Sequence, residues 1–302
     1  METYIIGSIL KEYRTRLNIS QEDISFDLCA VSTLSRIEGG TQLPRRKLVE
    51  ALFSRMGMTS PSSGIPMSRT DFYRENLEYR INEMVARADF EIAGLLEEYK
   101  NCDKDMDVFE RQFYTFYKTL SENAKTTDDK KALEQYVSAL RLTVKNYDVK
   151  ELPLARLLTR IEILILNNIS RTLYSLGEEE NAISIMEFLR SYFEKGIVSE
   201  EEKAKNYHVI LFNLENWYGL SGNDKKSLEI SEIAIDSCSK YGPSNLFPYH
   251  IFNKGCALVK LGRMEEGKKS LEHSFVIMEE LKKCDDIASG KKWCKEKLGL
   301  NL

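Results

Sequence analysis

Three breaks in the second half of the chain repeat one pattern, and this repetition limits the possible folds more than any other feature. Each break is a glycine in a polar stretch, at Gly177, Gly222 and Gly262, with spacings of 45 and 40 residues. A helix-length apolar stretch lies on either side of each glycine. A small residue follows five positions later in every copy, namely Ala182, Ser227 and Gly267. Two antiparallel helices approach closely near their turn, and a small side chain permits that approach, so the pattern predicts stacked helix pairs.

Weaker copies of the pattern occur upstream, with Ala93 and Ala132 at the small position. They give about five helix pairs between residues 72 and 282, followed by a terminal capping helix over 284–298. The pattern resembles tetratricopeptide (TPR) repeats, and this resemblance implies a right-handed superhelix. Composition agrees with an all-α fold, because the 302 residues include only 6 prolines and 16 glycines.

A linker divides the chain. The stretch MTSPSSGIPMS, at 58–68, is rich in Pro, Gly, Ser and Thr, which is typical of a connecting segment. We therefore expect a small head at 1–57, a linker at 58–70 and a helical repeat body at 71–302.

The head has the pattern of four short helices. Apolar residues recur at helical spacing over 6–17, and Ser20 followed by Asp23 marks the start of a second helix. A third helix is expected over 31–38, where Leu34 and Ile37 face the core and two glycines follow. A fourth helix is expected over 46–56.

The stretch SQEDISFDLCAVSTLSRIEGG, at 20–40, resembles the XRE (lambda-repressor-like) helix-turn-helix family. One departure is Ser25, where that family usually has alanine. The resemblance implies that the third helix enters the major groove of DNA and that its short side chains reach base edges, while basic residues contact phosphates. The expected DNA-binding residues are Gln21, Ala30, Val31, Ser32, Thr33, Ser35, Arg36, Arg45, Arg46 and Lys47.

The head and the body differ in net charge, in agreement with a head that binds DNA and a body that does not. The head carries eight Lys and Arg against seven Asp and Glu, a net of +1, while the whole chain has a net charge of −4. The acidic body does not suit general nucleic-acid binding, but a local cluster such as Arg45, Arg46 and Lys47 can still bind phosphates.

Asparagine recurs nine residues before each of the three break glycines, at Asn168, Asn213 and Asn253. This position lies on the first helix of each pair, which faces the concave side in TPR arrays. An amide side chain can both accept a hydrogen bond from the backbone N–H of an extended peptide and donate one to its backbone carbonyl. The expected peptide-binding residues are Lys118, Asn168, Arg171, Asn213, Asn216, Phe252 and Asn253. The alternative is that these asparagines only hydrogen-bond neighbouring helices.

A helix-turn-helix head, a linker and a TPR-like body together resemble the Rgg/PlcR/PrgX (RRNPP) group of peptide-responsive quorum-sensing regulators. The resemblance implies a cytoplasmic homodimer that binds a two-fold symmetric double-stranded DNA operator. It also implies a short signalling peptide in the groove, whose binding changes the dimer arrangement and so DNA binding. Two other functions remain open. One is a transcription factor whose body serves dimerisation or protein-partner binding without a peptide, and the other is a scaffold in which the body acts.

Other classes of function find no support in the sequence. There is no nucleotide-binding loop and no GxSxG or HExxH motif, so we expect neither an enzyme nor a cofactor. The six cysteines form no CxxC pair and the three histidines are scattered, so the spacing predicts no metal site. The sequence has no run of about 18 apolar residues, so we expect no membrane-spanning helix. The charges near the N-terminus lie too close to its apolar residues for a signal peptide.

Overall fold

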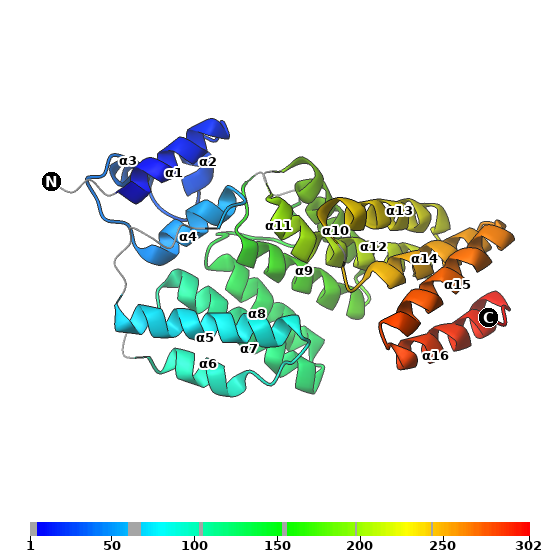
Figure 1. Cartoon of the computed structure of the whole chain (residues 1–302). Coiled ribbons are helices and arrows are strands. Elements are labelled where there is room, and N and C mark those ends of the chain that lie inside the picture. The colour runs from blue at the N-terminus through cyan, green and yellow to red at the C-terminus, as the bar shows by residue number, and fades with distance from the viewer. Residues whose placement is uncertain (1–4, 60–67, 103–104, 153–155, 197, 243) are drawn as a thin grey trace. The chain divides into compact units, whose positions relative to one another are not determined.

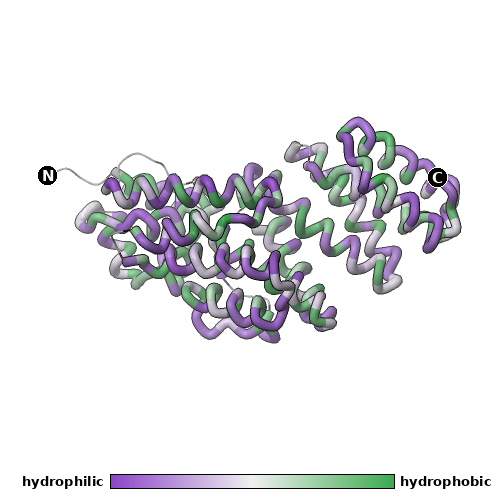
Figure 2. The backbone as a smooth tube through the Cα atoms, turned by 90° about the horizontal axis from the view of Figure 1, so that it is seen from below, coloured by the Kyte–Doolittle hydropathy of each residue, from purple (hydrophilic) through white to green (hydrophobic). Residues whose placement is uncertain are grey.

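The computed structural model describes residues 5–59, 68–102, 105–152, 156–196, 198–242 and 244–302. Every regular element in these ranges is a helix, which confirms the all-α prediction (Figure 1). The chain divides into two compact units, Met1–Ile185 and Met186–Leu302. Hydrophobic and hydrophilic residues alternate along the helices, the pattern of helices that bury one face (Figure 2).

The N-terminal head consists of α1 (Ile5–Arg16), α2 (Gln21–Ser25), α3 (Val31–Glu38) and α4 (Arg46–Arg55). Ser20 caps α2, because its Oγ accepts a hydrogen bond from the Asp23 backbone N–H at 2.9 Å. The third helix has the predicted bounds. It ends where Gly40 adopts a φ of 68°, a conformation that glycine takes without strain.

Buried aliphatic side chains fix α3 within the head. Leu34 and Ile37 are fully buried on α3, as is Leu10 on α1. The two helices also approach closely at Gly7, where a Cβ would overlap the Ile37 carbonyl. Burial of each aliphatic side chain contributes about 1.5–3 kcal/mol to the free energy of folding. Only the side of α3 that carries Leu34 and Ile37 packs into the core, and the other side stays exposed.

The first unit continues with helices of the repeat body. They are α5 (Arg69–Ala86), α6 (Ala93–Lys100), α7 (Val108–Thr126), α8 (Asp129–Arg141) and α9 (Arg160–Ser175), followed by the start of α10 (Glu179–Lys195). Neighbours in sequence pack together, α5 on α6, α7 on α8 and α8 on α9. Capping boxes begin α5, α7 and α9, which defines where each helix starts.

The second unit contains the end of α10 and the remaining helices. They are α11 (Glu200–Glu202), the π-helical turn η1 (Lys203–Tyr207), α12 (His208–Leu220), α13 (Asp224–Tyr241), α14 (Phe247–Lys260), α15 (Met264–Glu280), α16 (Cys284–Trp293) and the π-helical turn η2 (Cys294–Leu298). Successive helices from α12 to α15 pack on one another. The helix expected over 284–298 corresponds to α16 and η2.

The three break glycines form the turns predicted for them, with φ values of 83°, 78° and 84°. Ala182 is fully buried, and Ser227 donates a 2.8 Å hydrogen bond to the Glu215 carbonyl of α12. A Cβ at Gly267 would lie 2.5 Å from Val259 Cγ2. These close approaches confirm the role of the small residue in the three clear copies.

One weaker copy is wrong. Ala93 is exposed because it is the first residue of α6, whereas Ala182, Ser227 and Gly267 are each the fourth residue of their helix. Residues 60–67 of the predicted linker lie outside the described residues. The predicted linker extends to residue 70, but α5 already begins at Arg69, after Ser68, whose Oγ caps the helix by accepting from the Asp71 N–H at 3.0 Å. Among the described residues, no helix is both long and apolar enough to cross a membrane.

Candidate functional site

The outer side of α3 presents short polar side chains to solvent. Val31, Ser32, Ser35 and Arg36 are exposed, as is Ala30 just before the helix, while Thr33 is half-buried. Arg36 Nε donates to the Ser32 carbonyl at 3.3 Å, so the guanidinium lies along its own helix. This face can come close to a flat or grooved partner, because none of the side chains before Arg36 is long.

Gln21 is fixed by an ion pair of the head. Its Nε2 donates to Glu38 Oε2 at 2.7 Å, and both Glu38 oxygens also accept from Arg14, at 2.6 and 2.9 Å. Glu38 is buried on α3, so this bidentate pair links α1 to α3. The same network holds Gln21 half-buried at the first position of α2.

The three consecutive basic residues have different surroundings. Arg45 is exposed. Arg46 donates to Glu50 at 2.8 Å and to Glu75 of α5 at 2.7 Å, and its side chain is only 15% exposed. Lys47 likewise pairs with Glu50 and with a carboxylate of α5. Two of the three basic residues predicted to bind phosphates therefore already pair with carboxylates of this chain.

Lys47 bridges α4 and α5. Its Nζ donates to Glu50 at 2.9 Å and to Glu78 of α5 at 2.7 Å. Burial by itself lowers the pKa of Lys47, but attraction by Glu78 and Glu50 outweighs this effect and the pKa is raised. Lys47 therefore stays charged and joins the head to the first helix of the body.

A second connection between head and body centres on Glu162 of α9. This carboxylate is fully buried, and its Oε1 lies 3.7 Å from Nη2 of the buried Arg55 of α4. Oε1 also accepts from Thr143 Oγ1 at 2.7 Å, and Oε2 accepts from the Thr159 N–H at 2.7 Å. Arg55 donates in turn to the Phe26 carbonyl at 2.6 Å, so one buried chain of contacts leads from α9 to the end of α2.

Arg156 strengthens the same connection. Its guanidinium forms a 2.8 Å bond to Asp27, donates to the Thr143 carbonyl at 3.0 Å and lies over the Phe26 ring. Sequence reasoning did not identify this junction. The spacing of Thr159 and Glu162 signals a capping box, but nothing in the local pattern gives Glu162 a partner in the head.

The predicted peptide-binding residues of the first unit have local contacts. Lys118 lies 3.6 Å from Glu122 on its own helix and is half exposed. Asn168 donates to the Leu164 carbonyl one turn earlier, at 2.9 Å, and Arg171 is exposed. These contacts leave Lys118 and Arg171 accessible, whereas Asn168 is partly buried.

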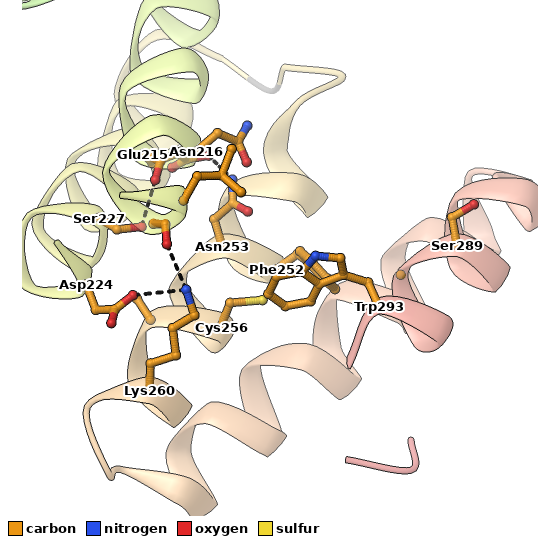
Figure 3. Close-up of a pocket in the computed structure, with 14 residues that line it drawn as sticks. Glu215, Asn216, Asp224, Ser227, Phe252, Asn253, Cys256, Lys260, Ser289 and Trp293 are labelled. Carbon is orange, nitrogen blue, oxygen red and sulfur yellow. Dashed lines mark hydrogen bonds and ion pairs between the residues drawn. The ribbon is translucent and has the colours of Figure 1, made fainter. Parts of the chain in front are cut away.

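In the second unit, three predicted residues meet at one pocket. Asn216, Phe252 and Asn253 line a cavity of about 310 Å³ formed by α12, α13, α14 and α16 (Figure 3). Phe252 and Trp293 form an aromatic wall, with ring centroids 6.0 Å apart. This volume is at the low end of the range for ligand sites, roughly 300–1,000 Å³, and suits one or two residues of a peptide.

The opposite wall of the pocket is polar and charged. Lys260 Nζ donates to the Gly219 carbonyl at 2.7 Å and lies 3.2 Å from Asp224 Oδ1. Asn253 donates to Glu215 at 2.7 Å, the inter-helix bond that the alternative interpretation expects of these asparagines. Asn216 donates at 3.0 Å to the Phe212 carbonyl, and its amide oxygen remains available as an acceptor.

Asn213 does not line this pocket, although it is only half-buried on the same helix. Asn168 belongs to the other unit. The structure thus brings Asn216, Phe252 and Asn253 together. Joint peptide binding by the recurring asparagines Asn168, Asn213 and Asn253 stays a prediction.

The chain resembles known proteins in its structure, but no match is found by sequence. No protein-family model matches the sequence, and a search of curated proteins gives no match. Among solved structures, PlcR of Bacillus thuringiensis in complex with the peptide PapR7 and DNA has a TM-score of 0.58 at 17% identity, over 93% of this chain and 98% of that chain. PlcR in its apo form has a TM-score of 0.57 at 16% identity, over 98% and 99%. The resemblance to the RRNPP group is confirmed at the level of the fold.

Proposed function

We propose that this chain is a sequence-specific DNA-binding transcriptional regulator whose repeat body binds a short signalling peptide. The observation that carries the proposal is the shared fold, because PlcR has been solved with a peptide and DNA and is matched along nearly its whole length. The proposed form is a cytoplasmic homodimer on a two-fold symmetric operator, in which peptide binding alters DNA binding. No catalytic step belongs to this function.

The DNA-binding half of the proposal rests on α3. Ser32, Thr33 and Ser35 donate to or accept from base edges, and Val31 contacts a thymine methyl group. Arg36 and Arg45 contact phosphates, with Gln21 and the first N–H groups of α2 beside them. Arg46 and Lys47 act indirectly, because their ion pairs hold α4 against α5.

The first test of DNA binding is a double substitution on α3. Ser32→Glu with Thr33→Glu puts two negative charges on the proposed groove-facing side, and we expect specific DNA binding to fall at least 100-fold without loss of folding. Operator sites are first selected from random double-stranded DNA by the wild-type chain, and binding is then measured by fluorescence anisotropy.

The matched control adds charge elsewhere in the head. Thr15 is exposed on α1, so Thr15→Glu is expected to retain operator binding within about threefold. Circular dichroism checks that both variants stay folded. Retention of wild-type affinity by the α3 variant would exclude α3 as the reading helix.

The peptide-binding half rests on the pocket of the second unit. An apolar side chain of the ligand packs between Phe252 and Trp293, and the amide of Asn216 bonds the ligand backbone. Lys260 and Asp224 offer both signs of charge at the opposite wall. Beyond this pocket, the proposal includes Asn213, Asn253, Asn168, Arg171 and Lys118 as further peptide contacts.

Trp293 provides a direct readout for this site. We expect short peptides encoded near the gene, or selected from a heptapeptide library, to change its fluorescence on binding. Asn216→Ala removes one hydrogen bond and is expected to weaken binding by about 2- to 10-fold. Asn245→Ala is the matched control, because Asn245 is exposed in the same unit and does not line the pocket.

The same measurement separates the proposal from its alternative. If a peptide binds, operator affinity measured with saturating peptide should change, since a ligand shifts only equilibria whose states it binds differently. If no library member binds while the operator is still recognised, the body serves dimerisation or a protein partner instead.

A further inference from the structure

Two histidines and a cysteine, far apart in sequence, meet inside the second unit. His208 begins α12, Cys238 lies near the end of α13 and His250 lies on α14. One ligand atom from each side chain lies within 4.8 Å of the other two. The cluster does not line the pocket, and none of the proposed functions uses it.

All three side chains are buried. Their exposed fractions are 1% for His208, 6% for Cys238 and 0% for His250. Within the part of the chain that the structure describes, Nε2 of His250 is buried without a hydrogen-bond partner. Buried polar atoms nearly always have a partner, so an unpartnered imidazole nitrogen beside a thiol needs an explanation.

The spacing of the donor atoms suits a tetrahedral metal ion. His208 Nδ1 and Cys238 Sγ are 3.5 Å apart. Zinc bonds of about 2.3 Å to sulfur and about 2.0–2.1 Å to nitrogen, at a tetrahedral angle, put the two donors about 3.5 Å apart. The other donor separations are within 4.8 Å, so zinc binding requires these side chains to move closer to the ion.

Glu215 of α12 provides the outer support that metal-binding histidines usually have. Its Oε1 accepts from His250 Nδ1 at 2.8 Å, and the carboxylate is fully buried. This bond places the proton of His250 on Nδ1 and leaves the Nε2 lone pair free to bind a metal. Glu215 also accepts from Asn253, so the cluster is connected to the polar wall of the pocket.

We propose that His208, Cys238 and His250 bind one zinc ion, with Glu215 orienting His250. Zinc is the ion that best suits a mixed set of one thiolate and two imidazoles, and three protein ligands leave one position for water. The ion joins α12, α13 and α14 from inside and releases the thiol proton on binding. It thereby stabilises the second unit and the carboxylate that holds Asn253.

The experiment uses the full chain, first freed of metal by dialysis against a chelator. Zinc alone is titrated in competition with a chromophoric chelator, and one equivalent is expected to bind. Cys238→Ala and His250→Gln should each lower zinc affinity more than 100-fold. Glu215→Gln should lower it by about 10- to 100-fold, the usual effect of removing an outer-shell partner.

Matched controls come from the same unit. Cys284 and His273 are exposed and outside the cluster, so Cys284→Ala and His273→Gln should bind zinc as the wild type does. Equal loss in controls and cluster variants, or no high-affinity equivalent in the wild type, would overturn the proposal.

A second measurement keeps the test decisive if a cluster variant does not fold. Cobalt replaces zinc in the wild-type chain, and a cysteine ligand gives a thiolate-to-cobalt charge-transfer band in the ultraviolet. Zinc should also raise the melting temperature of the metal-free chain. A cobalt spectrum without the thiolate band would contradict Cys238 as a ligand.

Discussion

At the scale of single residues, position on α4 decides what a basic side chain does. Arg46 and Lys47 are the first two residues of α4, where their side chains meet Glu75 and Glu78 of α5. Arg45 precedes the helix and stays exposed. An internal carboxylate within 3 Å competes with a phosphate for the same cation, so the three residues cannot contribute equally to DNA binding.

The salt dependence of DNA binding distinguishes these residues. Arg45→Ala should reduce the slope of log affinity against log salt by about 1, because it removes one phosphate contact. Lys47→Ala should leave the slope unchanged but lower the free energy of unfolding by about 1.5–3 kcal/mol, the value of its charged hydrogen bonds. Anisotropy titrations at several salt concentrations and urea unfolding measure the two effects. If both variants reduced the salt-dependence slope equally, Lys47 would contact DNA phosphates, contrary to this prediction.

At the scale of helices, close approach at one residue sets the geometry of a pair. α14 and α15 meet where Gly255 faces Gly267, and a Cβ on Gly267 would lie 2.9 Å from the Gly255 carbonyl oxygen. Real side chains do not tolerate this distance to backbone. The small position of the repeat is therefore a packing requirement.

Alanine substitution measures this requirement. Gly267→Ala should destabilise the second unit by about 1–3 kcal/mol, the cost of overpacking a tight contact. At Gly94 of α6 a Cβ would meet nothing within 4 Å, so Gly94→Ala should be neutral or stabilise by up to about 1 kcal/mol. Thermal unfolding compares the two, and similar melting temperatures would refute the packing role of Gly267.

At the scale of the first unit as a whole, a buried ionic junction joins head and body. Arg55 of the head and Arg156 of the body both lie close to Glu162, at 3.7 and 3.8 Å. Such a junction is costly to assemble but more costly to break, because removing one charge leaves the other buried and unpaired. The junction therefore connects the start of α9 to the loop that follows α2.

Glu162→Gln tests the junction. The substitution keeps the size of the side chain and removes its charge, and we expect a loss of about 3 kcal/mol in the free energy of unfolding. Glu83→Gln is the control, because Glu83 and Arg87 form an exposed pair worth at most about 1 kcal/mol. Urea unfolding followed by circular dichroism measures both. A Glu162 variant as stable as the control would show that the junction does not hold the head.

Features that depend on residues within a few positions of one another could be predicted from the sequence alone. These include the Ser20 cap, the bounds and buried residues of α3, and the glycine turns with their small residues. Each is encoded locally, because helix periodicity and capping act over three to five residues.

Contacts between residues that are distant in the sequence could not be predicted in this way, because they depend on the tertiary fold. Glu162 pairs with Arg55, and His208, Cys238 and His250 meet inside the second unit, although no spacing in the chain relates them. Such contacts depend on how whole helices stack, and the sequence pattern of one helix does not contain that information.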